Sequence, residues 1–435
     1  MAFTIIIDYY AGLKIEQSAG KNRRLYLILS LIANIGVLAV FKYYSFITQN
    51  VSWLLQYSEK ENPFPVLSIL LPIGLSFHTF QAMSYTIEVY RGKQKAEHHF
   101  GIYALYVMFY PQLVAGPIER PQNILHQFYE KHTFDFQRIC QGLKLMLWGF
   151  FMKMVIADNL ALIANPVFDN AHHYKGLAII IAIFAFTIQI FCDFAGYSSI
   201  ALGAAKVMGF TLMNNFRRPY LAESVSEFWT RWHISLSTWF KDYVYITLGG
   251  NKVGAYKWGL NIFIVFMLSG LWHGANWTYV IWGIIHAMFL ITGKFSSPLR
   301  AKIAKTIGLT NLPILNRFLN IGVTFSLVSF AWIFFRAPDL DNALYMLKNM
   351  FTNWHLNDLK DTLNLLGFGR LPKTRIVLFL GILLFEQLYQ EYFGSLKALL
   401  TNQPMTVRWS IYFIILFSIF LFGAYQEVRF IYFQF

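Results

Sequence analysis

Long apolar runs separated by short polar stretches dominate the sequence. A helix needs about 20 consecutive, largely apolar residues to cross the hydrocarbon core of a membrane. Seven runs are candidates by this measure: residues 25–47, 65–90, 177–210, 260–291, 318–335, 376–389 and 409–430. Three of these are long enough to be kinked, tilted or split into two helices.

Two further runs, residues 101–115 and 142–156, are shorter and more interrupted. Their pattern favours half-spans or interfacial helices. Taken together, the runs predict an all-α polytopic membrane protein with roughly ten membrane-embedded helices. We find no internal repeat and no low-complexity linker, so we expect residues 1–435 to form a single membrane domain.

The composition excludes an ordinary soluble protein. Hydrophobic residues make up 56% of the chain and charged residues 13%, whereas soluble domains carry about 25% charged residues. The net charge of +14 comes from 36 basic and 22 acidic residues. The basic residues form short clusters between apolar runs, as in the cytoplasmic loops of membrane proteins. A nucleic-acid-binding protein would need one contiguous basic face, so nucleic acid is not an expected partner.

The first loops predict an orientation, because basic residues are enriched on the cytoplasmic side. The loop after residue 47 is nearly neutral, whereas both flanking polar segments are basic. Those segments carry Lys14, Lys21, Arg23 and Arg24 before the first strong span, and Arg91, Lys93 and Lys95 after the second. We therefore expect the N-terminal tail and the loop after Tyr90 to be cytoplasmic.

Residues 214–258 are too polar to span a membrane simply. Aromatic and basic side chains alternate there, as at a membrane interface. One interpretation is an amphipathic segment on the cytoplasmic headgroups, and another is a re-entrant loop that lines a cavity. The residues concerned are Trp229, Trp232, Trp239, Tyr243 and Tyr245, among Arg217, Arg218, Arg231, Lys241 and Lys252.

Polar groups at membrane depth are candidates for function, because they are expensive to bury. The best candidate is His273, which lies between Gly270 and Gly274 in an otherwise apolar run. A neutral imidazole there could act as a general base toward a hydroxyl group. The alternative from sequence alone is a histidine hydrogen-bonded to a neighbouring helix.

The other buried polar candidates are weaker. His286 lies 13 positions after His273, about 220° round a straight helix, which argues against a metal pair and favours packing or hydrogen bonding. Taken alone, His233 is an interfacial histidine and His78 a packing residue. Asp193 fits a helix–helix hydrogen bond.

Several kinds of chemistry lose support. The two cysteines, Cys140 and Cys192, form no CxxC pair and no cluster with histidines, so neither a disulfide framework nor a zinc site is indicated. The sequence has no Walker loop, GxSxG elbow or HExxH motif.

Seven motifs in a fixed order resemble the bacterial membrane-bound O-acyltransferase (MBOAT) family. The resemblance is closest to its AlgI-like branch of alginate O-acetyltransferases, and more distant to D-alanyl transferases of the DltB type. Each motif is weak by itself, but their common order extends from near Tyr9 to the last residue. They are VAGPIERP (114–121), VIADNL (155–160), CDFAGYS (192–198), EFW (227–229) with WHISLS (232–237), WHG (272–274), WIFFRA (332–337) and FIYFQF (430–435).

The resemblance implies a ring of helices around a central funnel open to both membrane faces. It implies that His273 is the catalytic histidine and that His233 is the second signature residue, which would orient the donor or stabilise an oxyanion. No cofactor is expected to be permanently bound, and acetyl-CoA is the expected donor. The residues expected to contact substrate are Trp232, Trp272, Asn276, Arg217, Arg218 and Lys241.

Arg217, Arg218 and Lys241 would attract the phosphates of coenzyme A, although surface charge facing anionic lipid explains them equally well. Two features depart from the family pattern. Relatives carry further hydrophobic sequence before the segment matching residues 4–16, so either the start is shortened or the first helices are absent. Ser199 replaces a common aspartate, and no role is assigned to it.

The leading hypothesis is an enzyme of the bacterial inner membrane that passes acetyl groups out of the cytoplasm for O-acetylation of a surface polysaccharide. A periplasmic SGNH-type partner is expected to accompany it. The alternatives are the same fold with another donor or acceptor, such as D-alanylation of teichoic acid or O-acetylation of peptidoglycan, and a transporter or channel without covalent chemistry.

Overall fold

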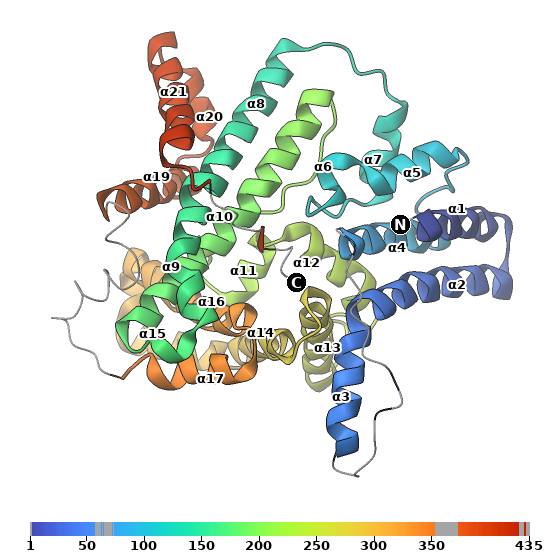
Figure 1. The fold of residues 1–435 in the computed structure, drawn as a ribbon, viewed down its shortest axis with the longest axis horizontal. Coiled ribbons are helices and arrows are strands. Elements are labelled where there is room, and N and C mark those ends of the chain that lie inside the picture. Colours follow the sequence, from blue (N-terminus) through green and yellow to red (C-terminus); the bar gives the residue numbers. More distant parts are fainter. Residues whose placement is uncertain are drawn as a thin grey trace. The chain divides into compact units, whose positions relative to one another are not determined.

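The computed structural model describes residues 2–56, 62, 64, 72, 74–352, 373–425 and 430–431. All regular structure within these ranges is helical, which confirms the predicted all-α class (Figure 1). The described chain divides into two compact units. Unit 1 comprises Met1–Met146 and Ile200–Asn214, and unit 2 comprises Leu147–Ser199 and Asn215–Gln434.

Unit 1 begins with a group of helices, the first two of which are joined by the turn at residues 18–19. They are α1 (Ala2–Gln17), α2 (Gly20–Leu38), η1 (Ala39–Tyr43), α3 (Tyr44–Gln56), α4 (Leu75–Tyr90), α5 (Phe100–Met108), α6 (Tyr110–Leu113), α7 (Pro121–Ile124) and η2 (Leu125–Tyr129). Two long helices, α8 (Phe136–Phe150) and α10 (Leu177–Met208), contribute residues to both units.

Unit 2 contains the remaining helices. They are η3 (Phe151–Ala157), α9 (Asp158–Asp169), η4 (Ala171–His173), η5 (Pro219–Leu221), α11 (Val225–Arg231), α12 (Ile234–Phe240), η6 (Lys241–Tyr245), α13 (Ala255–His273), α14 (Trp277–Phe295), α15 (Ser297–Thr306), η7 (Leu309–Asn311), α16 (Pro313–Arg336), α17 (Leu340–Asn349), α19 (Lys373–Tyr392), α20 (Leu396–Thr401) and α21 (Met405–Phe422).

Seven helices of the described residues are long and apolar enough to cross a membrane, so the chain is a multi-pass membrane protein. The count of roughly ten embedded helices is not confirmed. The seven are Gly20–Gln56, Phe136–Asp169, Leu177–Met208, Ala255–His273, Trp277–Phe295, Pro313–Arg336 and Met405–Phe422.

The structure corrects one predicted segment and refines two others. Residues 142–156 are not a half-span, because they belong to the uninterrupted 34-residue run Phe136–Asp169. Residues 260–291 form two helices, α13 and α14. Residues 376–389 lie within α19, which is not among the seven candidate spans. Residues 65–71 and 73 of the predicted span 65–90 lie outside the described residues.

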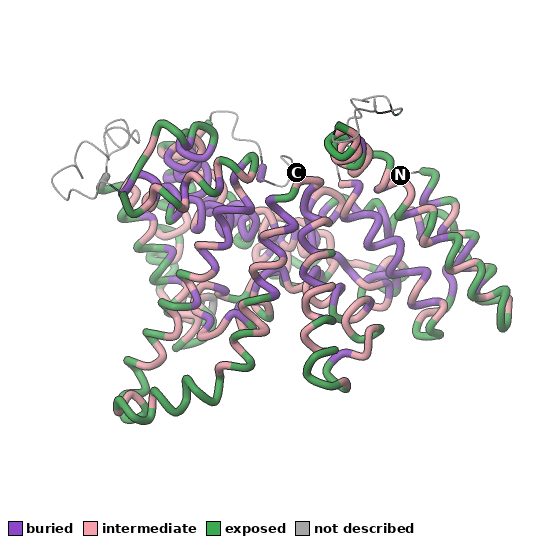
Figure 2. The backbone as a smooth tube through the Cα atoms, turned by 90° about the horizontal axis from the view of Figure 1, so that it is seen from below, coloured by how far each residue is buried: buried purple, intermediate pink, exposed green. Residues whose placement is uncertain are grey.

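Figure 2 shows exposed or half-buried positions along much of the long helices. Many of these positions carry large apolar side chains: Ile32 is 62% exposed on α2 and Phe417 is 56% exposed on α21. An extensive apolar surface of this kind is unfavourable in water. It is the surface expected of helices that face lipid.

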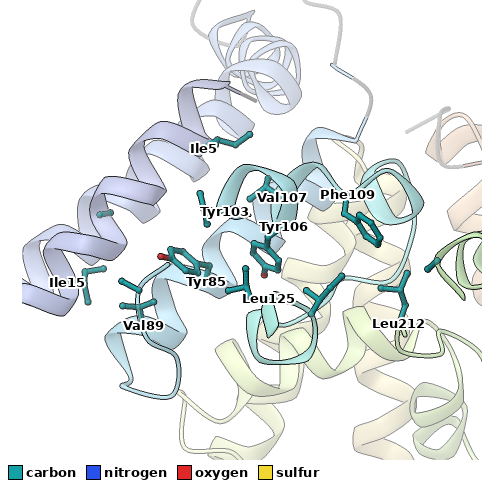
Figure 3. Packing of buried hydrophobic residues seen from close by; sticks show 14 residues of the cluster. Ile5, Ile15, Tyr85, Val89, Tyr103, Tyr106, Val107, Phe109, Leu125 and Leu212 are labelled. Atoms are coloured by element: carbon teal, nitrogen blue, oxygen red, sulfur yellow. The ribbon is translucent and has the colours of Figure 1, made fainter. Parts of the chain in front are cut away.

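The core of unit 1 is built largely from tyrosines. Tyr85 of α4 and Tyr103 and Tyr106 of α5 are fully buried, and their rings pack between Ile5 and Ile15 of α1 on one side and Leu125 on the other (Figure 3). The ring centroids of Tyr85 and Tyr103 are 4.5 Å apart. This aromatic packing joins α1, α4 and α5.

A buried carboxylate joins three helices of unit 1. The side chain of Asp8 on α1 accepts hydrogen bonds from the Ser30 hydroxyl at 2.6 Å and from the Asn34 amide at 2.8 and 2.9 Å, both on α2. Ser30 also bonds to Thr86 on α4 at 3.1 Å. Polar contacts of this kind hold helices together where apolar burial alone gives little driving force.

Candidate functional site

Two antiparallel helices of unit 2, α13 and α14, position the candidate catalytic histidine. Glycines allow their backbones to touch. A Cβ atom on Gly270 would lie 2.2 Å from the carbonyl oxygen of Tyr279, and one on Gly283 would lie 2.2 Å from that of Phe266. Only glycine fits such a close approach. His273 is therefore held at the end of α13, beside the turn into α14.

Three aromatic rings surround the imidazole of His273. Its centroid lies 4.9 Å from the Trp272 ring, 5.1 Å from Trp282 and 5.1 Å from Phe335, all at steep interplanar angles. His273 is 5% exposed. Apolar rings of this kind exclude water and lower the local dielectric, which strengthens the polar interactions that the imidazole makes.

His233 lies at a strained turn that precedes α12. Its backbone has φ 41° and ψ 55°, a left-handed conformation that residues other than glycine rarely adopt. Asn215 stabilises the turn: its carbonyl oxygen accepts from Ile234 N at 2.9 Å and its Oδ1 accepts from Ser235 N at 3.3 Å. Strain of this kind is often found at functional sites.

His233 is buried and lies outside the seven candidate spans. Burial lowers the pKa of its imidazole to about 3, because an apolar environment disfavours the charged form. The ring is therefore neutral at physiological pH, so one ring nitrogen carries a proton and the other is an acceptor.

Trp272 connects the two predicted histidines. Its ring centroid lies 6.2 Å from His233 and 4.9 Å from His273. Trp232 belongs to the same aromatic cluster, since it packs 5.1 Å from Trp332. The structure thus brings together four of the residues singled out in the sequence, two histidines and two tryptophans.

A pocket of about 1050 Å³ opens beside this cluster, entirely within unit 2. Helices α11 to α14 and α16 form its walls. The apolar part of the lining comprises Ile262, Val265, Phe266, Phe289, Leu290, Val323 and Leu327, among others. The polar part includes Lys241, Tyr245, Asn251, Lys294, Ser297 and Arg300. The lining carboxylate of Glu223 is paired with Arg317 at 3.1 Å.

The pocket follows one face of α13. Trp258, Ile262, Val265 and Ser269 line it at helical spacing, and the next position on this face is His273. At 1.5 Å per residue, the lined stretch is about 16 Å long and His273 lies about 6 Å further along the axis. Since His273 does not itself line the pocket, the pocket ends one helical turn before it.

The other end of the pocket is basic. Trp258 and Lys294 lie at the ends of α13 and α14 remote from His273, with Lys294 Nζ 3.7 Å from the indole centroid. Lys294 and Arg300 are exposed there, and the exposed Lys241 lines the same pocket. Three cations on one pocket provide an attractive site for an anion.

The remaining substrate-contact predictions have different surroundings. Lys241 lines the pocket. Arg217 is exposed, and the Arg218 Nε atom binds Glu391 at 2.6 Å. Asn276 caps α14, because its Oδ1 accepts from Thr278 N at 3.1 Å while its amide donates to the Pro338 carbonyl at 2.9 Å.

Of the segment 214–258, residues 215–258 belong to unit 2, where Trp232, His233, Trp239 and Tyr243 are buried. An ion-pair network holds this segment to α16 and α19. In that network Arg218, Arg231 and Arg317 all bind Glu391, at 2.6, 3.1 and 3.1 Å. Whether the segment enters the membrane stays a prediction.

A second ion-pair cluster anchors α10. Lys153 Nζ lies 2.7 Å from Asp193 and 2.6 Å from Asp158, and the other Asp193 oxygen accepts from Ile431 N at 2.8 Å. The Lys153–Asp193 contact confirms the hydrogen bond between helices that was expected for Asp193, and it is also an ion pair. Within the described residues, no group of three or more His, Cys, Asp or Glu side chains is placed to hold a metal ion.

The sequence-based interpretation did not single out Trp229 as a pocket residue. Its indole Nε1 donates to His286 Nδ1 at 3.3 Å, which confirms a hydrogen-bonding role for His286. The 220° rotation between His273 and His286 assumed a straight helix and does not apply, because the helix is broken between them. The spacing Trp229-x-x-Trp232 before His233 could have indicated that Trp229 lies near the histidine.

The fold and this cluster define a polytopic helical membrane protein with buried, signature histidines. The sequence matches the family model described as MBOAT, membrane-bound O-acyltransferase family, over residues 5–335. The chain therefore belongs to the membrane-bound O-acyltransferase family and is an O-acyltransferase.

Three relatives illustrate the range of the family. The chain is 37% identical over 408 residues to the probable alginate O-acetylase AlgI of Pseudomonas aeruginosa, covering 93% of this chain and 73% of that protein. It is 34% identical over 374 residues to the peptidoglycan O-acetyltransferase of Helicobacter pylori, covering 80% and 68%. A teichoic acid D-alanyltransferase of Bacillus subtilis is more distant, with 28% identity over 243 residues, covering 53% and 61%.

Proposed function

We propose that the chain transfers an acetyl group from cytoplasmic acetyl-CoA to an extracytoplasmic hydroxyl acceptor, for the O-acetylation of a surface polysaccharide. The observation that carries this proposal is the pocket, whose basic mouth continues along one face of α13 toward His273. Phosphate groups of coenzyme A fit a mouth with Lys241, Lys294 and Arg300. The apolar part of the pocket lining suits the acyl thioester end of the donor.

The basic mouth also supports the orientation. Lysines and arginines near the ends of membrane helices concentrate on the cytoplasmic side. The mouth would then face the cytoplasm, where acyl-CoA is made. This agrees with the direction of transfer expected from the sequence.

In the proposed mechanism His273 is the general base. It takes the proton of the acceptor hydroxyl as that oxygen attacks the thioester carbonyl carbon. The carbon–sulfur bond breaks, the acetyl ester forms, and the imidazolium returns its proton to the leaving thiolate. His233, neutral and held at its strained turn, would donate its N–H to the oxyanion or orient the donor.

The acceptor is proposed from the relatives. Two of the relatives that match most of this chain are named as probable alginate O-acetylases. On that likeness we also propose a bacterial inner-membrane location and a periplasmic SGNH-type partner. Peptidoglycan is the second candidate acceptor, because a peptidoglycan O-acetyltransferase also matches most of this chain. D-alanyl transfer has weaker support, with a relative that covers 53% of the chain.

The test uses the full-length protein in lipid nanodiscs with radiolabelled acetyl-CoA. Mannuronate oligosaccharide and a soluble peptidoglycan fragment are the two acceptor probes, each with and without the SGNH-type partner. We expect labelled ester on the oligosaccharide in the wild-type protein and none in His273→Ala. His126→Gln in unit 1, where the ring is exposed, is the control. Equal ester formation by wild type and His273→Ala would overturn the catalytic assignment.

The same assay separates the alternatives. Label on the peptidoglycan fragment alone would favour the second acceptor. Movement of intact acetyl-CoA across the bilayer of proteoliposomes, without thioester cleavage, would favour a transporter and overturn the proposal.

A further inference from the structure

Trp229 lies between the pocket and Trp282, one of the rings around His273. Its side chain belongs to the pocket lining. Its ring contacts include Phe266, at a centroid distance of 5.1 Å, and Trp282, at 5.7 Å. Trp282 in turn lies 5.1 Å from His273. The series from pocket to histidine is therefore Trp229, then Trp282, then His273.

His286 fixes the orientation of Trp229. The Trp229 indole donates to His286 Nδ1 at 3.3 Å, and the two rings meet edge to face at 4.9 Å. His286 is fully buried and also contacts Trp282 at 5.0 Å. A bulky indole held on one side by a hydrogen bond and on two others by rings has little freedom to change rotamer.

The pocket by itself does not favour a short acyl group. Much of its lining consists of aliphatic and phenyl side chains. Each further methylene of an acyl chain that is buried against such a lining favours binding. Rejecting a longer acyl group therefore requires a rigid obstacle at the reacting end. Trp229 is a rigidly held pocket residue in contact with Trp282, which in turn contacts His273.

We infer that Trp229, positioned by His286, is the residue that limits the size of the acyl group delivered to His273. This inference rests on the proposed function, in which an acyl thioester uses this pocket. Trp229 would contact the acyl group, and His286 would act through Trp229 as a positioning residue. With the indole in place, a small acyl group such as acetyl would pass it toward His273 and a longer one would not.

The experiment measures kcat/KM for acetyl-, propionyl- and butyryl-CoA with the full-length protein in nanodiscs and one acceptor probe, mannuronate oligosaccharide. We expect Trp229→Leu to raise the butyryl-to-acetyl ratio at least tenfold, because removing one obstacle of this kind changes selectivity by about 10- to 200-fold. His286→Phe keeps a ring and loses the acceptor, and should raise the ratio about threefold. His286→Gln restores an acceptor and should return the ratio to the wild-type value.

Two matched variants control for general effects of losing an indole. Trp258→Leu lies at the opposite end of the same pocket and should raise the KM of every acyl-CoA without changing the ratio. Trp409 lies on the exposed face of α21, so Trp409→Leu should change neither the KM values nor the butyryl-to-acetyl ratio. If Trp229→Leu does not fold, Trp229→Phe takes its place, with an expected rise of at least threefold.

The outcomes distinguish the two proposals. An unchanged ratio in folded, acetyl-active Trp229 variants would overturn this inference and leave the proposed function intact. An equal rise of the butyryl-to-acetyl ratio in Trp258→Leu would also overturn the inference, because the whole pocket, and not Trp229, would then determine the selectivity. Failure of the wild-type protein to cleave any acyl-CoA would overturn both.

Discussion

His78 in unit 1 and His273 in unit 2 are both buried among apolar helices, with 1% and 5% exposure, yet their surroundings differ. His78 Nε2 forms a 2.8 Å hydrogen bond with the Thr4 hydroxyl, which ties α4 to α1. His273 lies among three aromatic rings, one helical turn beyond a large pocket. Burial alone therefore does not distinguish a structural histidine from a catalytic candidate. The neighbouring pocket does.

The largest expected effect tests this contrast directly. His273→Ala should lower kcat for acetyl transfer by about 10³-fold, since general-base assistance contributes about 10²- to 10⁴-fold, and should leave thermal stability nearly unchanged. His78→Ala should do the reverse. It should destabilise unit 1 by about 1–2 kcal/mol through the lost Thr4 contact and keep turnover within about twofold. Turnover and thermal unfolding in detergent check both.

A loss of turnover in His78→Ala as large as that in His273→Ala would remove the distinction. The distinction would also fail if His78→Ala kept its normal stability but lost activity. His78→Gln, which keeps a polar group facing Thr4, is the matched variant and should recover most of the stability.

The second contrast concerns charged pairs. Glu391 in unit 2 is bound by three arginines and its side chain is 8% exposed. Glu391→Ala should destabilise the protein by about 2 kcal/mol, because three partly buried arginines, with 13–33% side-chain exposure, lose their shared partner. The exposed His98 in unit 1 pairs with Glu16 at 2.9 Å, and His98→Gln should cost less than about 1 kcal/mol. Chemical denaturation of both variants measures the difference, and similar losses would contradict it.

A third contrast concerns helix contacts. A Cβ on Gly283 would meet the Phe266 backbone oxygen at 2.2 Å, whereas one on Gly259 would meet only an Ile291 methyl at 3.9 Å. Gly283→Ala should therefore cost about 2 kcal/mol through overpacking and lower acetyl transfer, because α13 carries His273. Gly259→Ala, on α13, should cost nothing measurable. Equal melting temperatures for the two variants would contradict this prediction, because α13 and α14 would then tolerate an added methyl group at their closest contact.

Much of the fold could be predicted from the sequence, because long apolar runs leave few choices in a membrane. The run 177–210 became the single helix α10 for this reason. The break at residues 274–276 was harder to place, since it depends on a glycine contact and on the Asn276 cap. Residues 142–156 were assigned too short a helix because Lys153 interrupts the apolar pattern, while the fold compensates that charge with Asp158 and Asp193.

The candidate site was predictable only in part. The motif residues His233, Trp272 and His273 lie in one cluster, as expected of signature residues. The role of Trp229 depends on its hydrogen bond to His286, 57 positions away, and no local pattern encodes that distance. Similarly, Arg218 was considered for its charge, but its partner Glu391 lies 173 positions further along the chain.

The smallest expected effect is a pH dependence of stability that distinguishes the buried His233 from an exposed histidine of unit 1. Burial lowers the pKa of His233 to about 3 from an ordinary value of 6.5, so between these values the unfolded chain binds a proton that the folded chain does not. Stability should therefore fall as the pH drops below 6.5, by about 1.4 kcal/mol per pH unit from this group. His233→Gln should lose that part of the slope, whereas His126→Gln should keep it. Denaturation at pH 7, 6 and 5 measures the three slopes, and identical slopes for wild type and His233→Gln would mean that the imidazole is hydrated rather than enclosed beside Phe194 and Trp272.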